Sequence, residues 1–348
     1  EELERVVNDL EGGYGAIAFS SGMATIDGLM RLFRPGDHVI SGNDLYGGTE
    51  RHFEGFEHDL SNIDFTFVDT SDLGKVEKAF KPNTKAIYVE TPTNPMMHVT
   101  DIAAIAKLAH AHKAILIVDN TFMTPYFQNP IPLGADVVVH SATKYLGGHN
   151  DTMGGILVVN SKDLYVALRE IVLAVGSNLA PFDSWLILRG IKTLGVRMER
   201  HQANALAIVR FLKTEKRVKK IYFVGLADSQ GFAITKRQCR GFSGMITFRV
   251  DSPSTAKYIL DHVRLIEFAE SLGGTETLLT YPLTQTHFDV PEKVRKQLGI
   301  DDCLLCLSVG LEDSADLIAD LKQAIEGAPA DDSYAVDANV TSKDLELK

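Results

Sequence analysis

The sequence predicts an α/β protein in which a mostly parallel sheet is followed by a smaller α/β unit. Short apolar, β-branched runs alternate with helical patterns through the first half of the chain, which is typical of a parallel sheet covered by helices on both faces. The length of 348 residues allows a large core in one or two units. The composition, 45% hydrophobic and 23% charged, excludes a disordered or fibrous chain.

Each expected strand of the larger sheet is a short run rich in Val, Ile, Phe or Ala between turn-forming segments. In such sheets ligands bind beyond the carboxyl ends of the strands, so the residues just after each strand are the place to look for chemistry. The expected strands cover residues 16–19, 38–40, 64–68, 85–89, 115–119, 136–140 and 156–159.

Helical spacing is clearest in residues 101–113, with Thr100 as the expected N-cap, and in the longer stretches 162–173 and 183–212. These elements predict a catalytic unit over residues 1–217, a smaller α/β unit over 218–326 and a flexible tail or linker over 327–348. In the smaller unit, strands are expected at residues 245–250 and 304–309 and helices at 254–263 and 314–325.

The net charge and the number of cysteines limit which kinds of partner and which cellular compartment we expect for the chain. The chain has 35 Lys and Arg against 46 Asp and Glu, a net charge of −11, which disfavours nucleic acid and anionic membranes as partners. Its apolar runs are far shorter than the roughly 20 residues of a membrane span. Cys239, Cys303 and Cys306 are too few for a disulfide framework, and no signal-peptide pattern opens the chain. We therefore expect a cytoplasmic protein with a small-molecule partner.

The two ends are unusual. Leu3, Val6 and Leu10 already follow helical spacing at the very start, where no Met stands, and the last residues have no apolar periodicity. This pattern is expected of a chain cut from something longer. A cloning boundary explains it equally well.

Two segments that follow strands could bind an anion. Ser21, Gly22 and Met23 lead from the first strand into a helix, and free backbone N–H groups at a helix start bind phosphate well. Ser141 and Thr143, after a later strand, could add hydroxyl groups to such a site. By itself the first segment is equally consistent with ordinary turn chemistry.

Three further side chains could bind a planar heterocycle. Asp119 ends a very apolar strand, where it either caps the next segment, the commoner role, or holds a protonated ring nitrogen. Lys144 is surrounded by small hydroxyl residues and glycines; most lysines lie on the surface, but one with a lowered pKa can form a Schiff base with an aldehyde. Tyr46, beside Gly47 and Gly48, either stacks on a ligand or packs beside a turn.

Together these groups meet the demands of pyridoxal 5'-phosphate (PLP): a lysine, a carboxylate at the pyridine nitrogen, an aromatic ring and a phosphate site. All follow strands of one predicted sheet, which makes PLP the predicted cofactor. No metal site is predicted, because the spacing of Cys303 and Cys306 lacks the second cysteine pair or histidines of a zinc site.

Long motifs then point to a family. They are Glu90-Thr-Pro-Thr-Asn-Pro95, Val118-Asp-Asn-Thr-Phe122, Ser141-Ala-Thr-Lys-Tyr145 with Gly148-His-Asn150, Ala269-Glu-Ser-Leu-Gly-Gly274 and Leu307-Ser-Val-Gly-Leu-Glu-Asp313. Over about residues 3–325 the chain resembles the PLP enzymes of cysteine and methionine metabolism, which include cystathionine γ-lyase, cystathionine γ-synthase and methionine γ-lyase. The resemblance implies a fold type I, transferase-like architecture with a seven-stranded sheet, and a homo-oligomer, either a dimer or a tetramer.

The resemblance also implies roles for individual residues. Lys144 would form the Schiff base and move the substrate's α-proton, Asp119 would hold the pyridine nitrogen, and Tyr46 would stack on the ring and transfer protons. Asn94 would lie near the cofactor's phenolic oxygen. The remaining cofactor-binding residues would be Ser21, Gly22, Met23, Thr121, Ser141 and Thr143, and the substrate-binding residues Arg51, Glu270, Ser271, Thr286 and Cys306.

The chain departs from the family pattern in two places. The family has an N-terminal Tyr-Ser-Arg segment that reaches the neighbouring subunit's phosphate, and this sequence begins after that point. The family also has an arginine two residues before the final Ser-Val-Gly, where it binds the substrate's α-carboxylate in a bidentate manner. Cys306 stands there instead, and a cysteine cannot replace a fixed cation.

The predicted function is a carbon–sulfur lyase that eliminates sulfur from a cysteine- or homocysteine-type conjugate. In one variant, motivated by Cys306 and the chain ends, it is a domain of an assembly-line (polyketide) synthase and its substrate is tethered to a carrier protein. Two alternatives stay open. One is a γ-replacement synthase similar to cystathionine γ-synthase, and the other is a catalytically silent family member that acts as a scaffold.

Overall fold

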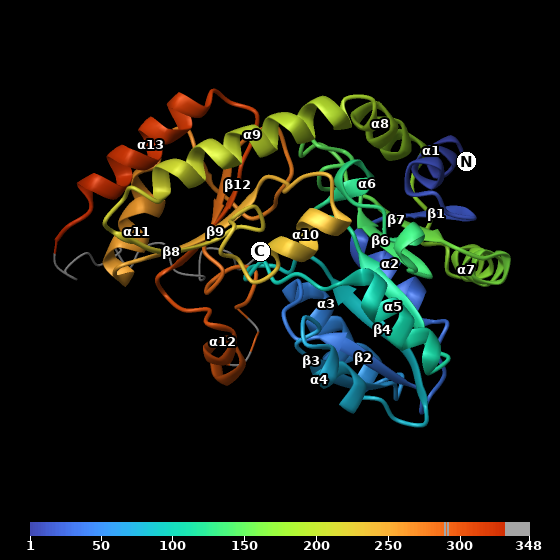
Figure 1. The fold of residues 1–348 in the computed structure, drawn as a ribbon. Coiled ribbons are helices and arrows are strands. Elements are labelled where there is room, and N and C mark those ends of the chain that lie inside the picture. The colour runs from blue at the N-terminus through green and yellow to red at the C-terminus, as the bar shows by residue number, and fades with distance from the viewer. Residues whose placement is uncertain (289, 291, 331–348) are drawn as a thin grey trace, which may run out of the picture.

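The computed structural model describes residues 1–288, 290 and 292–330, in which two sheets lie in separate parts of the molecule (Figure 1). The larger sheet has seven strands in the order β1-β7-β6-β5-β4-β2-β3. All neighbouring pairs are parallel except those that β7 makes with β1 and β6. The strands are β1 (Gly15–Phe19), β2 (His38–Gly42), β3 (Asp64–Val68), β4 (Thr84–Glu90), β5 (Ile115–Asp119), β6 (Val137–Ser141) and β7 (Gly155–Val159).

This architecture confirms the predicted α/β class with its mostly parallel sheet. The central strands are apolar on both faces, as a sheet covered by helices requires. Val138 and Ile156 belong to the hydrophobic cluster on one face, and Val139 and Leu157 to the cluster on the other. The period of two along each strand thus divides the core between the two faces.

The helices surround both sheets, and α9 connects the two parts of the molecule (Figure 1). Leu194 and Met198 at its start pack in the core of the larger sheet, whereas Ile208 and Leu212 near its end pack in the core of the smaller one. The helices are α1 (Glu2–Glu11), α2 (Gly22–Met30), α3 (Gly47–Arg51), the π-helix η1 (His52–His58), α4 (Leu73–Lys78), α5 (Ile102–Ala111), α6 (Thr124–Phe127), the 3-10 helix η2 (Ile131–Leu133), α7 (Lys162–Val175), α8 (Pro181–Ile191), α9 (Leu194–Leu212), α10 (Phe232–Gln238), α11 (Pro253–His262), α12 (Glu292–Leu298) and α13 (Ser314–Gly327).

The expected N-cap of α5 was wrong by one residue. Asp101 caps the helix, because its carboxylate accepts a hydrogen bond from the Ala104 N–H at 3.2 Å. The Thr100 hydroxyl is instead buried and paired with the Thr70 hydroxyl at 2.7 Å.

The single helical stretch expected over residues 183–212 is two helices, α8 and α9. Gly190, near the end of α8, lies so close to Gly147 that a Cβ atom there would stand 2.2 Å from the Gly147 carbonyl oxygen. The chain turns after this contact, and Arg197 of α9 reaches back to donate to the Gly190 carbonyl at 2.8 Å. Helical periodicity continues through the turn, so the sequence does not reveal it.

The smaller sheet has five strands in the order β10-β11-β12-β9-β8, of which only β9 and β12 were predicted. β10 is two residues long and β11 three, too short for a visible alternation. β8 begins Val-Lys-Lys, with both lysines exposed, as in a strand at the edge of a sheet. The strands are β8 (Val218–Tyr222), β9 (Met245–Val250), β10 (Glu267–Phe268), β11 (Leu278–Thr280) and β12 (Leu304–Ser308).

The predicted tail begins too early, since α13 includes Gly327. Residues 331–348 of that tail lie outside the described residues. Among the helices that are described, none is both long and apolar enough to cross a membrane.

Candidate active site

The carboxyl ends of the central strands open into a cavity of about 250 Å³. It also reaches β11 and β12 of the smaller sheet, through Thr280 and Cys306. All the site residues predicted from sequence line this cavity, with the exception of Arg51. They are Ser21, Gly22, Met23, Tyr46, Asn94, Asp119, Thr121, Ser141, Thr143, Lys144, Glu270, Ser271, Thr286 and Cys306.

The start of α2 and the end of β6 form one wall. Ser21 caps α2 by accepting a hydrogen bond from the Ala24 N–H at 3.0 Å. A Cβ atom on Gly22 would lie 2.9 Å from the Ser141 Cβ, so only glycine lets the helix start approach that strand so closely. The Ser141 N–H in turn donates to the Thr121 hydroxyl at 2.9 Å. Helix amides and hydroxyl groups therefore converge here, which is the donor set that a phosphate needs.

Asp119 is half-buried at the end of β5. Its Oδ1 accepts from the Thr121 N–H at 2.9 Å, and the Tyr88 hydroxyl donates to Oδ2 at 3.4 Å. Burial raises the pKa of Asp119, while the hydrogen bonds from Thr121 and the charge of His140 oppose that rise. The capping role weighed from sequence is thus present as a tight turn at Thr121. It does not conflict with a place for Asp119 in the cavity wall.

Glu90 is a buried carboxyl group in the wall, to which the sequence reasoning assigned no role. The register of β4 and β5 pairs it with Asp119. Burial, and then the charge of Asp119, raise the pKa of Glu90 well above its ordinary value. Its Oε2 accepts from the Tyr46 N–H at 3.0 Å. The signal that could have revealed it is its position at a strand end beside the strand of Asp119.

Lys144 projects into the cavity from the loop after β6. Its Nζ donates to the Ser271 hydroxyl at 2.9 Å. Burial lowers the pKa of Lys144, and the nearby Glu270 carboxylate only partly opposes this. Ser271 has a φ of 136°, a sparsely populated conformation for a residue other than glycine. A desolvated amine with a fixed hydrogen-bond partner has the properties of a Schiff-base lysine.

Tyr46 precedes α3 at the mouth of the cavity and is 40% exposed. Both following glycines are required by close contacts. A Cβ atom on Gly47 would lie 2.1 Å from the Thr286 carbonyl oxygen, and one on Gly48 would lie 2.5 Å from the Tyr46 ring. Burial raises the pKa of the Tyr46 hydroxyl, and the charge of Arg51 partly counteracts it. Arg51 itself lines a neighbouring cavity that shares Thr286.

Cys306 lies in β12 and lines the cavity with apolar neighbours such as Met245 and Leu272. Burial raises the pKa of Cys306 to about 11, so the thiol is neutral at physiological pH. Among the described residues that line the cavity, Lys144 is the one cationic side chain. Cys303 packs in the core of the smaller sheet, a different hydrophobic cluster from that of Cys306, so the two cysteines do not form a joint site.

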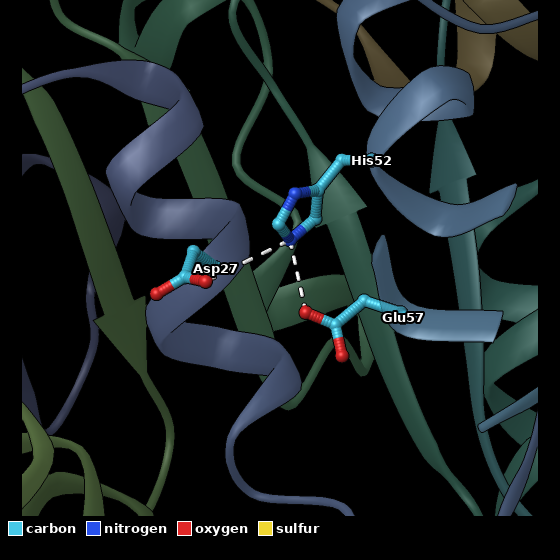
Figure 2. Close-up of side chains that lie close together, drawn as sticks. All are labelled: Asp27, His52 and Glu57. Carbon is cyan, nitrogen blue, oxygen red and sulfur yellow. Dashed lines mark ion pairs between the residues drawn. The ribbon is translucent and has the colours of Figure 1, made fainter. Parts of the chain in front are cut away.

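The side chain of His52 lies close to the carboxylates of Asp27 and Glu57, a grouping that resembles a metal site. His52 Nε2 is 3.0 Å from Glu57 Oε1 and 4.0 Å from Asp27 Oδ1, and Figure 2 shows the three side chains converging from α2 and η1. The five-residue step from His52 to Glu57 matches the hydrogen-bond period of a π-helix. Arg31 already donates to both oxygens of Asp27, at 3.0 and 3.1 Å. We therefore assign an ion-pair cluster that ties α2 to the segment after Tyr46.

Comparison with known proteins decides the family. Residues 1–326 match the family described as Cys/Met metabolism PLP-dependent enzyme. The chain belongs to this family. The family resemblance, the fold and the PLP cofactor expected from sequence are thereby confirmed.

Individual relatives include both lyases and synthases. The chain is 48% identical to a cystathionine gamma-lyase of Bacillus subtilis over 93% of its length and 85% of the relative. It is 45% identical to a cystathionine gamma-synthase of Haemophilus influenzae over 92% of its length and 83% of the relative. A crystal structure of cystathionine gamma-lyase from Lactobacillus plantarum complexed with L-serine superposes with a TM-score of 0.92, at 47% identity, over 94% of this chain and 86% of that one. Family membership therefore leaves the exact reaction open.

The cavity fits PLP. The contact between Gly22 and Ser141 makes a cradle that any side chain on Gly22 would fill, and Asp119 offers a half-buried carboxylate for a protonated ring. When bound, PLP supplies an electron sink for a carbanion at the substrate's α-carbon.

Proposed function

We propose that the protein is a carbon–sulfur lyase that releases sulfur from a cysteine- or homocysteine-type S-conjugate. The observation that carries the proposal is the half-buried amine of Lys144, held by Ser271 in one cavity with Asp119 and Tyr46. Relatives named as cystathionine lyases, at 46–48% identity, support the direction of the reaction.

The residues of the cavity would divide the chemistry as follows. The amine of Lys144 takes the substrate's α-proton, and the hydrogen bond to Ser271 orients it for that transfer. The C–S electron pair leaves with sulfur, which receives a proton to become a thiol. Tyr46, fixed by the bond from its N–H to Glu90, is placed at the mouth of the cavity to assist that protonation. Hydrolysis then yields ammonia and a 2-oxo acid.

The direct test is the release of pyruvate or 2-oxobutanoate from S-conjugates by the PLP-loaded protein. A γ-replacement synthase would instead form a new thioether, and only when a second thiol is added. Product analysis with and without that thiol separates the two reactions. If a new thioether forms and no 2-oxo acid is released, the lyase proposal is wrong.

Cys306 supports a more specific proposal about the charge of the substrate's carboxyl group. Since a neutral thiol occupies this part of the wall, we propose that the substrate's carboxyl group is uncharged here, as in an ester, an amide or a thioester to a carrier protein. Comparing turnover of a cysteine S-conjugate with that of its methyl ester and of a carrier-linked form tests this version. Equal or faster turnover of the free acid would contradict it.

The broader setting is also part of the proposal. We propose that the active protein is a cytoplasmic homo-oligomer, with units dividing near residue 217. A scaffold without catalysis is disfavoured by the intact Lys144 and Asp119. If Lys144→Ala left the biological activity of the chain unchanged, the scaffold alternative would replace the lyase.

A further inference from the structure

A buried polar network lies on the face of the larger sheet opposite the cavity. Its centre is Glu11, the last residue of α1, which contacts His140 of β6 and Asn120, just after β5. These three side chains are at most 1% exposed. Because side chains alternate along a strand, His140 and Asn120 point away from the face on which Ser141 and Asp119 line the cavity.

Three side chains hold the Glu11 carboxyl group. Its Oε1 lies 2.6 Å from His140 Nε2 and accepts from Asn120 Nδ2 at 2.8 Å. Its Oε2 accepts from Asn129 Nδ2 at 3.3 Å. The two amide contacts are N–H groups that donate to the carboxyl oxygens, and the His140 ring occupies the remaining contact.

Both partners of Glu11 are adjacent in sequence to residues of the cavity wall. Asn120 directly follows Asp119, and its N–H donates to the Val139 carbonyl at 2.9 Å, which joins the ends of β5 and β6. Asp119 is surrounded by Tyr88 and Glu90 from β4, Thr121 from its own turn and His140 from β6. Of these groups, His140 is the one that can carry positive charge. That charge lowers the pKa of Asp119 against the effect of burial.

We propose that Glu11 is a positioning residue for the cofactor: by holding His140 and Asn120 in place beside Asp119, it keeps the Asp119 carboxylate ionised for the pyridine nitrogen of PLP. The effect passes through the sheet, from α1 on one face to the cavity on the other. The inference rests on the PLP cofactor and not on the direction of the reaction.

The same network also stabilises the fold, so the experiment must distinguish this structural role from the positioning role. Asn120 bonds to Gln128, and Gln128 accepts from Gln238, so the same chain of contacts helps to pack α10 against the larger sheet. A structural role alone would lower stability and loosen the whole site. The positioning role predicts an effect that depends on Asp119.

A double-mutant cycle makes this distinction. The dissociation constant of PLP is measured by titration of the apo-protein for the wild type, Glu11→Gln, Asp119→Asn and the double variant. We expect Glu11→Gln to weaken PLP binding by about tenfold, the factor that corresponds to one pKa unit at Asp119. In the Asp119→Asn background the same substitution should change binding by less than about twofold. An equal loss in both backgrounds would overturn the proposal.

Asp136→Asn is the matched control. Asp136 pairs with a histidine in the same way, with His110 Nε2 at 2.8 Å, and it accepts from the Leu116 N–H of β5. It lies at the opposite ends of β5 and β6 from the cavity, so its loss should reduce the melting temperature and leave PLP affinity unchanged. If Asp136→Asn weakens PLP as much as Glu11→Gln does, general loosening explains both results.

A measurement on the unmutated apo-protein holds even if Glu11→Gln does not fold. Nitrogen-15 NMR of histidine-labelled protein should show a His140 signal that shifts when PLP binds. A His140 signal that PLP leaves unchanged would overturn the proposal, since His140 would then not be coupled to the cofactor site at Asp119.

Discussion

At the scale of single residues, burial shifts the pKa values of the groups in the site. It lowers the pKa of Lys144 and raises the pKa values of Asp119 and Glu90. The Lys144 amine therefore loses its proton at a lower pH than an exposed lysine does, and the two carboxyl groups lose theirs at a higher pH than exposed carboxyl groups do.

Lys144 should make apo-protein stability depend on pH. A lysine whose pKa is lowered on folding binds fewer protons in the folded than in the unfolded state, so its destabilising effect is complete below the folded pKa and disappears as the pH rises through the ordinary value of 10.5. We therefore expect apo Lys144→Met to melt at a higher temperature than the wild type at pH 7, with a gap that narrows towards pH 10.5. A gap that is constant with pH would contradict this account, and Lys192→Met, on an exposed turn, serves as the control.

Cys306→Arg should convert the neutral wall into an anion site. Charge-assisted hydrogen bonds from a guanidinium contribute about 1.5–3 kcal/mol, so binding of a free amino-acid carboxylate should tighten by about tenfold or more. Binding is followed by the change in absorbance of the bound cofactor. Cys306→Ser, which adds no charge, is the control and should leave the affinity unchanged. No difference between the two variants would show that this wall does not contact the carboxyl group.

At the scale of elements, the position of the α2 N-terminus against β6 determines the anion site. A side chain at Gly22 would prevent α2 from approaching Ser141 as closely as it does, so this position requires glycine. The ion-pair cluster of Asp27, His52 and Glu57 fixes the same helix to the segment after Tyr46 (Figure 2). The helix that forms the anion site and the segment that carries Tyr46 are thus held in place by contacts with each other.

Gly22→Ala should separate α2 from Ser141. Overpacking of this size costs about 1–3 kcal/mol, which corresponds to a loss of PLP affinity of about tenfold or more. Gly55→Ala is the control, because a Cβ atom at Gly55 has no neighbour within 4 Å. The dissociation constant of PLP is compared for both variants, and an equal constant would show that the helix start can shift without cost.

At the scale of the whole molecule, α9 holds the two sheets in one arrangement. Its buried Arg197 donates to the Tyr145 carbonyl, next to Lys144, and to the Gly190 carbonyl of α8, each at 2.8 Å. Burial lowers the pKa of Arg197 to about 10. The guanidinium thus connects the cavity loop, α8 and the helix that spans both cores.

Arg197→Met should destabilise the protein because it leaves the buried Tyr145 carbonyl without its donor, whereas the Gly190 carbonyl still accepts from Thr193. One such unsatisfied group costs about 1–3 kcal/mol, so we expect a loss of about that size in urea unfolding. Arg200→Met on the same helix is the control, since Arg200 is exposed and its bonds to Leu311 and Glu312 carbonyls can be replaced by water. Equal losses for the two variants would contradict the connecting role of Arg197.

Sequence reasoning reached the seven strands of the larger sheet and the cofactor, and nearly all the site residues that it named line the cavity, since these lie in long apolar runs and in motifs directly after them. It did not reach Glu90 and His140 as part of the site, because each becomes informative only beside a neighbour from another strand. It placed Arg51 in the site, although the side chain lines an adjacent cavity. It also missed β8, β10 and β11, whose pairing depends on partners distant in sequence.

The sequence by itself determined the α/β class, the position of Lys144 and Asp119 after successive strands, and the neutral residue at 306. These properties depend on local periodicity and on residue chemistry, both of which follow from the order of the residues alone. Only the tertiary structure decided which charges meet. The raised pKa values of Asp119 and Glu90, the contact of Glu11 with His140 and the break between α8 and α9 all arise from burial and from contacts between segments far apart in sequence.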